Sequence, residues 1–318
     1  MKIVMFGRGV ISTQYAWAFE KAGHIVEFYV RPGRKAELGE TVNLNIYDAR
    51  KKISGVLVNK NWGIKMVEDI PGNHDYDLIF VSVQHYQFKK VADFLTDKFG
   101  NSTVLFFNNF WEEPLEQVAN LPAEQLVWGF GQAGGGFDEK GVLNGTLLGS
   151  ITIGIFGKEV TERTNEVIAL FQSADIKSKI SKDFRAYLFG HFVFDAAFAL
   201  ERIKYPTSEG LLKELKTSNY WRNVVANGKE LLPILKARNV DLANSSDLKL
   251  FNLPPWLISF LMKTVLRFLP PVKQMLSGHS NLTEMKSYCQ DVLQTGKELK
   301  ISLPRFEASK KLFQNNEM

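Results

Sequence analysis

The first thirty residues constrain the fold of this chain more than any other segment. An apolar run, a glycine turn, a helical stretch and a second apolar run follow one another directly: KIVMF (2–6), GRGVIS (7–12), TQYAWAFEKAG (13–23) and HIVEFYV (24–30). A strand, a turn, an amphipathic helix that ends at Gly23 and another strand make up a βαβ unit, in which the two strands are parallel. The sequence therefore predicts a parallel sheet.

The glycine turn reads Gly-x-Gly-x-x-Ser, which matches the dinucleotide-binding pattern except at its third glycine. Gly7 permits the tight turn, and Gly9 lets backbone N–H groups approach a pyrophosphate that the helix N-terminus then stabilises. Ser12 is small enough for the helix to pack closely on the strand. We predict that the turn binds a dinucleotide; a turn kept only for packing is the alternative. The predicted cofactor contacts are Gly7, Arg8, Gly9, Val10, Ile11 and Ser12.

The segment YVRPGRK (29–35), at the end of the second apolar run, bears on the choice of cofactor. A site that prefers NAD places a carboxylate near the adenosine ribose, where it accepts hydrogen bonds from the 2′-hydroxyl. This chain has Arg31, Arg34 and Lys35 there instead. Because cations suit a 2′-phosphate, we predict NADPH/NADP+ as the cofactor, with Arg31 and Arg34 among its contacts. A solvated basic loop is the alternative.

Strand patterns fill the first half of the chain, and helical patterns begin at about residue 160. DLIFVSV (77–83) and TVLFFN (103–108) are continuous apolar runs, as expected of strands buried on both faces. The glycine-rich GFGQAGGGFDEKG (129–141) predicts a mobile turn or hairpin. GVLNGTLLGSITIGIFG (141–157) predicts antiparallel edge strands.

These patterns predict an α/β protein in which an N-terminal Rossmann-type doubly wound sheet is followed by an all-helical C-terminal domain. We expect residues 1–175 to form an NADP-binding domain and residues 176–318 to form a helical domain for substrate binding and dimerisation. The long apolar helix of the second half, AYLFGHFVFDAAFALE (186–201), contains His191 and Asp195. Since residues four apart share a helix face, these two side chains should project together.

Composition argues against several classes of protein. The formal net charge is +5 with scattered Lys and Arg, which does not indicate nucleic-acid binding. The single cysteine, Cys289, excludes an internal disulfide and a Cys-based zinc site, and no metal-ligand spacing occurs. With no signal-peptide pattern before the first strand, we expect a cytoplasmic location.

The most apolar segment is PWLISFLMKTVLRFLPP (255–271). It carries Lys263 and Arg267 and is too short to span a bilayer. We predict a buried or interface helix, with a membrane-surface helix and membrane insertion as alternatives.

Several segments resemble the ketopantoate reductase (2-dehydropantoate 2-reductase) family, namely KIVMFGRGVIS, AGHIVEFYVRPGR, DLIFVSVQHYQ, FFNNF and TEMKSYCQDVLQTGKELKISLP. The resemblance runs nearly end to end. It implies a Rossmann domain, a helical C-terminal domain and an active site in the cleft between them. It also implies NADPH-dependent reduction of ketopantoate on the route to pantothenate.

The resemblance also implies cofactor contacts. Asn108-Asn109-Phe110 looks like the family's Gln-Asn-Gly, so Asn109 falls where an asparagine touches the nicotinamide end of the cofactor. Ala133 falls where an alanine backbone lies near the cofactor. Glu284, in TEM, falls on the glutamate of the family's Thr-Glu-Ile, which contacts the cofactor at the active site.

Three further positions depart from the family's pattern. Gln84 stands where the family has a lysine at the end of a buried run. His191 falls on the catalytic lysine, and Asp195 falls on an asparagine four residues beyond it. The resemblance thus implies His191 and Glu284 as catalytic residues and Asp195, Asn109 and Gln84 as substrate-binding residues.

Carbonyl reduction needs a proton donor besides the hydride donor, and imidazole titrates near neutrality. His191 would supply the proton, and Asp195 would orient the imidazole and favour its charged form. A hydrogen-bonded core pair is the alternative. A carboxylate at residue 195 also repels an anionic 2-oxo acid, so either His191 neutralises it or the substrate is not ketopantoate.

We therefore predict an NADPH-dependent reductase of a small carbonyl compound, with ketopantoate as the best single substrate and a homodimer as its possible assembly. The alternatives are an NADP(H)-binding sensor or interaction protein without reductase activity, and a peripheral membrane protein that uses residues 255–271.

Overall fold

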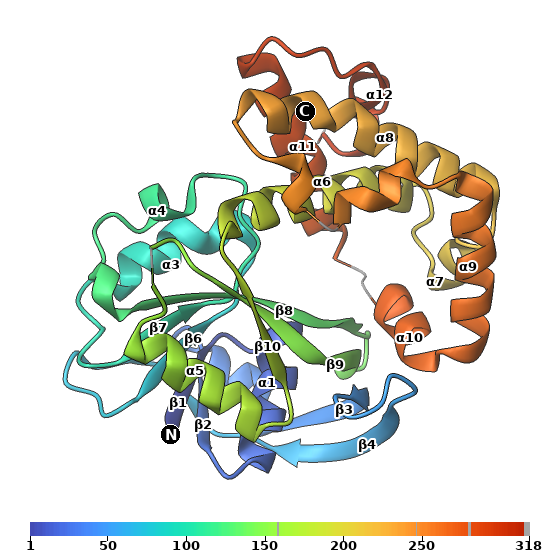
Figure 1. The fold of residues 1–318 in the computed structure, drawn as a ribbon. Coiled ribbons are helices and arrows are strands. Elements are labelled where there is room, and N and C mark those ends of the chain that lie inside the picture. The colour runs from blue at the N-terminus through green and yellow to red at the C-terminus, as the bar shows by residue number, and fades with distance from the viewer. Residues whose placement is uncertain (158, 246, 279–280, 315–318) are drawn as a thin grey trace. The chain divides into compact units, whose positions relative to one another are not determined.

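The computed structural model describes residues 1–157, 159–245, 247–278 and 281–314, and Figure 1 shows its ribbon. The chain divides into two compact units. Unit 1 comprises residues 1–108 and 112–182 together with helix α10 (Pro270–Gly278). Unit 2 comprises residues 109–111, 183–269 and the described residues after 280. The sequence placed its domain boundary after residue 175, but strand β10 (Lys177–Ser181) still pairs with the sheet of unit 1.

Unit 1 is built on one mixed sheet, whose ten described strands run in the order β4-β3-β9-β8-β7-β6-β1-β2-β5, with β10 beside β9. The other strands are β1 (Lys2–Phe6), β2 (Ile25–Tyr29), β3 (Thr41–Ala49), β4 (Val56–Gly63), β5 (Met66–Val67), β6 (Leu78–Val81), β7 (Thr103–Phe106), β8 (Leu126–Phe137) and β9 (Val142–Gly154). The neighbours from β8 through β7, β6 and β1 to β2 are all parallel. This arrangement confirms the predicted α/β class and its Rossmann-type sheet.

The segment 141–157 is not at an edge of the sheet, and this prediction was wrong. Its residues form the single strand β9, which is antiparallel to β8 but parallel to β3 and to β10. The hairpin of β3 and β4, which the sequence analysis did not assign, covers the other side of β9. The glycine-rich segment before it forms most of β8, and a turn closed by Gly141 N donating to Asp138 O at 2.9 Å connects the two strands.

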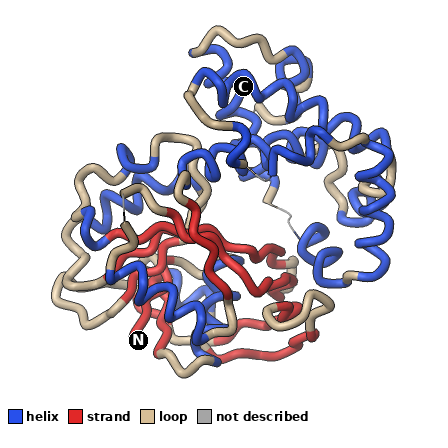
Figure 2. The backbone as a smooth tube through the Cα atoms, viewed as in Figure 1, coloured by secondary structure: helices blue, strands red, loops and turns tan. Residues whose placement is uncertain are grey.

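Unit 1 also contains short 3₁₀ helices and six described α-helices. These are α1 (Val10–Lys21), α2 (Arg34–Leu38), α3 (Phe88–Leu95), α4 (Pro114–Gln117), α5 (Glu162–Ser173) and α10, with the 3₁₀ helices η1 (His85–Gln87) and η2 (Ala123–Gln125). Figure 2 shows these helices in blue around the red strands.

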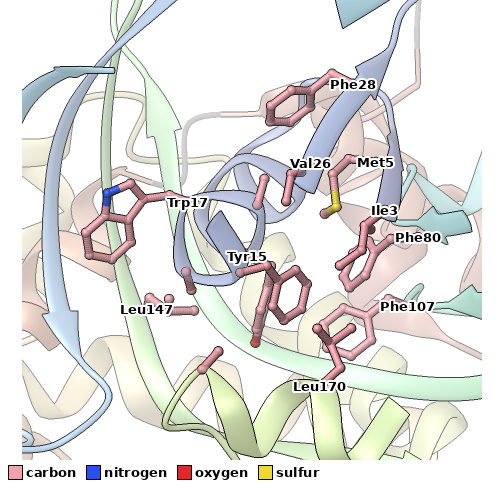
Figure 3. Close-up of a cluster of buried hydrophobic side chains, with 14 of the residues drawn as sticks. Ile3, Met5, Tyr15, Trp17, Val26, Phe28, Phe80, Phe107, Leu147 and Leu170 are labelled. Carbon is pink, nitrogen blue, oxygen red and sulfur yellow. The ribbon is translucent and has the colours of Figure 1, made fainter. Parts of the chain in front are cut away.

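Helix α1 is buried on all sides, so the predicted amphipathic character was wrong. Every residue from 12 to 19 is buried, and α1 packs against β8, β9 and α5. Figure 3 shows Tyr15 of α1 among the aromatic side chains of the core. Its ring packs edge-on against those of Phe107 and Phe171, with 5.1 and 5.7 Å between ring centroids. Because burial of these apolar side chains stabilises the position of α1, it also holds the glycine turn that precedes the helix in place.

Unit 2 is helical throughout its described residues. It contains α6 (Phe184–Arg202), α7 (Ser208–Glu214), α8 (Ser218–Ala237), α9 (Pro255–Phe268), α11 (Leu282–Glu298) and α12 (Pro304–Ala308), with the 3₁₀ helices η3 (Leu242–Asn244), η4 (Asp247–Asn252) and η5 (Lys310–Leu312). Helix α6 packs against both α8 and α11, because most of its side chains are apolar and buried. A 2.6 Å hydrogen bond from Arg305 Nε to Asn227 Oδ1 ties α12 to α8.

Helix α9 is the apolar segment for which a buried or interface helix was predicted. It packs on α8, and Ile258, Ser259 and Leu266 are buried. Its other side leaves Trp256 and Phe260 more than 60% exposed. Among the described residues, no helix combines the length and apolar character that crossing a bilayer requires.

Candidate functional site

The carboxyl ends of the central parallel strands lie in register at one edge of unit 1. Phe6, the last residue of β1, pairs with Tyr29 of β2 and with Val81 of β6. Val81 pairs in turn with Phe106 of β7. The glycine turn and Arg31 therefore begin at the same edge. Ligands of open α/β sheets bind there.

The backbone conformation of the turn favours glycine at residue 7, whereas residue 9 is a glycine that faces open space. Gly7 has φ of +87°, which a side chain would strain, and its N–H donates to Tyr29 O at 2.9 Å. Gly9 has φ of −77°, which any residue adopts, and a methyl group built on it would meet no atom within 4 Å. Neither strain nor packing requires glycine at residue 9. Because Gly9 is also the N-cap of α1, this open space lies where an anion would meet the helix N-terminus.

The remaining turn residues pack to different degrees. Val10 and Ile11 are half-buried against the core, and Ser12 is fully buried. A small residue is therefore needed at residue 12 for packing. Direct contact of these three residues with a cofactor stays a prediction.

Two guanidinium groups lie close together near the turn. Burial, and then the charge of Arg34, lower the pKa of Arg8. Arg8 Nη1 donates to Leu38 O at 3.3 Å, and Arg34 forms an exposed 2.7 Å ion pair with Glu37. Two like charges at this edge favour an anion between them. Arg31 is exposed on the same loop.

One acidic side chain near this loop was missed in the sequence. The carboxylate of Glu68 accepts a 2.9 Å hydrogen bond from Lys35 N. It follows the short strand β5, which pairs with β2, so its position depended on a pairing that the sequence did not reveal.

Ala133 and Gln84 lie in unit 1 with the glycine turn. Ala133 follows an irregularity of β8, where the pairing with β9 shifts after Gly131. Helix α1 holds this stretch, since Gln14 Nε2 donates to Gly134 O at 3.3 Å. Gln84 is half-buried just beyond β6 and caps the 3₁₀ helix η1.

Unit 2 contains a cluster of ionisable groups around His191. Helix α6 presents His191 and Asp195 on one face, with 3.4 Å between Nε2 and Oδ2. The other ring nitrogen, Nδ1, lies 2.7 Å from Oδ2 of Asp247, which begins η4. The imidazole therefore has a carboxylate at each nitrogen. It also stacks on Tyr187, with 6.2 Å between ring centroids and 9° between planes.

These two carboxylates fix the protonation of His191. Burial lowers the pKa of the imidazole, but the charge of Asp195, and the hydrogen bond and charge of Asp247, outweigh it and raise the pKa to about 9. At neutral pH the ring is an imidazolium with a proton on each nitrogen. Its side chain is 22% exposed.

Asn109 and Glu284 belong to the same cluster. Asn109 Nδ2 donates to Asp195 Oδ2 at 2.9 Å. The Tyr288 hydroxyl donates to Glu284 Oε1 at 2.9 Å and also forms a hydrogen bond with the Asn109 side chain. Burial, then the charges of Glu284 and Asp195, raise the pKa of Tyr288 far above its ordinary value, so it stays protonated.

The structure thus brings four predicted residues of unit 2 into one connected group, namely Asn109, His191, Asp195 and Glu284. It adds Tyr288 and Asp247, which the sequence analysis missed. Tyr288 is four residues after Glu284 on one helix, so the spacing argument used for His191 would have found it. No pattern in the sequence pointed to Asp247, which lies 56 residues from its partner.

Comparisons with known proteins agree with this fold. Residues 3–158 match the family model described as ketopantoate reductase PanE/ApbA. A search of curated proteins found no match to the sequence.

Several solved structures share the whole fold. A PanE/ApbA family ketopantoate reductase from Ralstonia eutropha JMP134 is 15% identical with a TM-score of 0.68, covering 98% of this chain and 97% of its own. D-mandelate dehydrogenase with NADH and anilino(oxo)acetate is 14% identical with a TM-score of 0.69 and the same coverage. A dimeric ketopantoate reductase from Staphylococcus aureus is 10% identical with a TM-score of 0.65, again with the same coverage. By the family model that matches residues 3–158, this part of the chain belongs to the ketopantoate reductase family, and the described residues share the fold of the solved structures above.

Proposed function

We propose that this protein is an NADPH-dependent reductase of a small carbonyl compound, in which His191 is the proton donor. The observation that carries the proposal is the imidazolium held between Asp195 and Asp247, in one connected group with Asn109 and Glu284. Family membership makes 2-dehydropantoate the first substrate to test.

The residues of unit 1 fit a nicotinamide dinucleotide. The open space at Gly9 would admit a pyrophosphate, and the guanidinium groups of Arg8 and Arg34 would hold further phosphate. NADH is bound in the related D-mandelate dehydrogenase. We favour NADPH here, because Arg31, Arg34 and Lys35 suit a 2′-phosphate, although the Glu68 carboxylate beside this loop suits a ribose hydroxyl.

When bound, the cofactor would supply the hydride for the carbonyl carbon. As the carbonyl oxygen gains negative charge, His191 donates its Nε2 proton to it, and the product is an alcohol. The Nδ1–H group keeps its hydrogen bond to the Asp247 carboxylate, so the ring, now neutral, keeps its orientation. Asn109 holds Asp195 in place, and Tyr288 links that group to Glu284.

The first experiment measures NADPH oxidation with a panel of 2-oxo acids, ketones and aldehydes. His191→Gln should lower kcat by about 100-fold or more, since general acid catalysis contributes that much, while the Kd for NADPH stays unchanged. His191→Lys keeps a protonated donor and should retain more activity than His191→Gln. Equal activity of all three proteins would refute the role of His191. Tight binding of NADPH without oxidation by any compound would favour the sensor instead.

A fluorescence titration that compares NADPH with NADH tests the cofactor directly. We expect the lower Kd for NADPH, and Arg34→Ala should weaken NADPH binding more than NADH binding. If Arg34→Ala weakened the binding of NADPH and NADH equally, Arg34 would contact the phosphates that the two cofactors share.

The assembly and location of the protein stay predictions. A dimer is recorded for the Staphylococcus aureus relative, and a homodimer is our expectation for this chain in a cytoplasmic setting. Light scattering of the purified protein would decide between monomer and dimer.

A further inference from the structure

A carboxylate stands beside the cationic loop that follows β2. The strands β1, β2 and β5 are parallel neighbours, so their carboxyl ends lie at the same edge of unit 1. Val67, the last residue of β5, pairs with Tyr29, the last residue of β2. The half-buried Glu68 follows Val67 directly. Its side chain therefore begins at the edge where Arg31 and the glycine turn also begin.

A tight turn and this carboxylate hold the loop. Arg34 N donates to Arg31 O at 3.0 Å and closes the turn. Gly33, the third residue of the turn, has φ of +83° and ψ of −16°, as a type II turn requires. The next amide, Lys35 N, donates to Glu68 Oε1 at 2.9 Å. The backbone thus anchors Glu68 next to a turn that carries an arginine at each end.

Two other carboxylates near the loop are engaged differently. Glu37 forms its 2.7 Å ion pair with Arg34. Asp69 accepts a 2.9 Å hydrogen bond from the amide of the next residue and lies 3.5 Å from Lys98 Nζ. Glu68 differs from both in that it is bonded to the backbone of the loop from a neighbouring strand.

We propose that Glu68 is a specificity-determining residue of the cofactor site, which narrows the preference for NADPH so that NADH is also used. A dinucleotide site that binds NADH needs a carboxylate to accept the 2′-hydroxyl of the ribose. The end of β2 supplies Arg31 instead, and β5 supplies the carboxylate. Arg31 and Arg34 suit a 2′-phosphate, whereas Glu68 repels it. The inference rests on the proposed function, which implies the cofactor.

The two effects of this carboxylate on the cofactors have opposite signs. Loss of a hydrogen bond to a charged acceptor weakens binding by about tenfold or more, which raises the Kd for NADH. Loss of a negative charge beside a phosphate lowers the Kd for NADPH. The second effect acts between exposed charges and should shrink as salt is added, whereas the first should persist.

Glu68→Gln tests this role with little disturbance of the loop, because the amide oxygen of glutamine still accepts the hydrogen bond from Lys35 N. Fluorescence titration gives the Kd of each cofactor at low and high salt. The ratio of the Kd for NADH to the Kd for NADPH should rise by at least about tenfold in Glu68→Gln at low salt. Wild-type turnover with a substrate found in the panel should proceed with either cofactor.

Glu166→Gln is the matched control. Glu166 is an exposed residue of α5 that lines a polar cavity together with Asp77 and Thr103. Thr103 begins β7 and Asp77 directly precedes β6, so this cavity lies at the opposite edge of the sheet. The substitution removes the same charge from unit 1 and should leave both Kd values unchanged.

The outcomes separate this inference from the proposed function. An unchanged ratio in Glu68→Gln, or a shift toward NADH, would overturn the role of Glu68 while NADPH oxidation by the wild type upholds the reductase. If the cofactors bind but no compound is reduced, the reductase function falls, and the ratio of Kd values still decides the role of Glu68. If neither cofactor binds, both proposals are refuted.

Discussion

The raised pKa of His191 makes the stability of the protein depend on pH in a direction that can be measured. In the unfolded chain the imidazole has its ordinary pKa of 6.5, and in the folded chain the pKa is about 9. The folded state therefore binds this proton more tightly. The resulting stabilisation is fully present below pH 6.5 and is lost as the pH rises through 9.

The magnitude follows from the size of the shift. A rise from 6.5 to about 9 corresponds to about 3 kcal/mol of differential interaction between the two protonation states. His191→Gln removes this titration. The difference in free energy of unfolding between the wild type and His191→Gln should therefore shrink by about 3 kcal/mol between pH 6 and pH 10.

Urea unfolding at a series of pH values measures this difference, and subtracting the variant cancels groups that titrate alike in both proteins. His24→Gln is a control of opposite sign. Burial, and then the charge of the N-terminus, lower the pKa of His24, so its contribution is present above pH 6.5 and is lost as the pH falls. An NMR titration of the His191 ring protons gives the pKa directly. A difference between wild type and His191→Gln that does not change with pH, or a ring that titrates near 6.5, would refute the account of the cluster.

Three further predictions concern packing and the cofactor turn. Gly9→Val should leave Tm nearly unchanged, because its side chain enters open space, yet raise the Kd for NADPH at least tenfold, as measured by fluorescence. Ile258→Ala should cost about 2–4 kcal/mol because the side chain is 3% exposed, whereas Trp256→Ser, at 64% exposure, should change the stability by less than about 0.5 kcal/mol in urea unfolding. Gly228→Ala should lose about 1–3 kcal/mol, since its methyl group would lie 2.2 Å from the Phe251 ring, and Phe251→Leu in the same chain should restore part of the loss.

The fold could be predicted where local pattern and burial agree. The first strand, the glycine turn and the second strand combine turn chemistry with continuous apolar runs. Strand β3 carries a readable signal, since Val42, Leu44 and Ile46 alternate with more exposed residues. Without β3 as its neighbour, β9 was predicted to lie at an edge. Helix α1 was predicted to be amphipathic, but its polar residues Ser12, Thr13 and Gln14 are buried together with its apolar ones.

Only those contacts of the candidate site that lie within a single helix could be predicted from the sequence. His191 and Asp195 share a helix face, so their spacing was enough to pair them. Asp247 is brought to the ring by tertiary structure, from a 3₁₀ helix with no periodic signal. The sequence alone therefore left the ring with one carboxylate and a pKa near neutrality. With the second carboxylate, that of Asp247, the imidazole of His191 is an imidazolium at neutral pH.

The same second carboxylate sets the supply of the proton. With a pKa of about 9, the ring is almost wholly protonated at pH 7, whereas an ordinary imidazole would be mostly neutral. A resident proton donor is thereby obtained at neutral pH. Asp247→Asn removes the hydrogen bond and the charge that help to raise the pKa of His191, so the alkaline limb of the kcat profile should move down by more than one pH unit. An unchanged limb would show that Asp247 does not set the protonation of the group on which turnover depends.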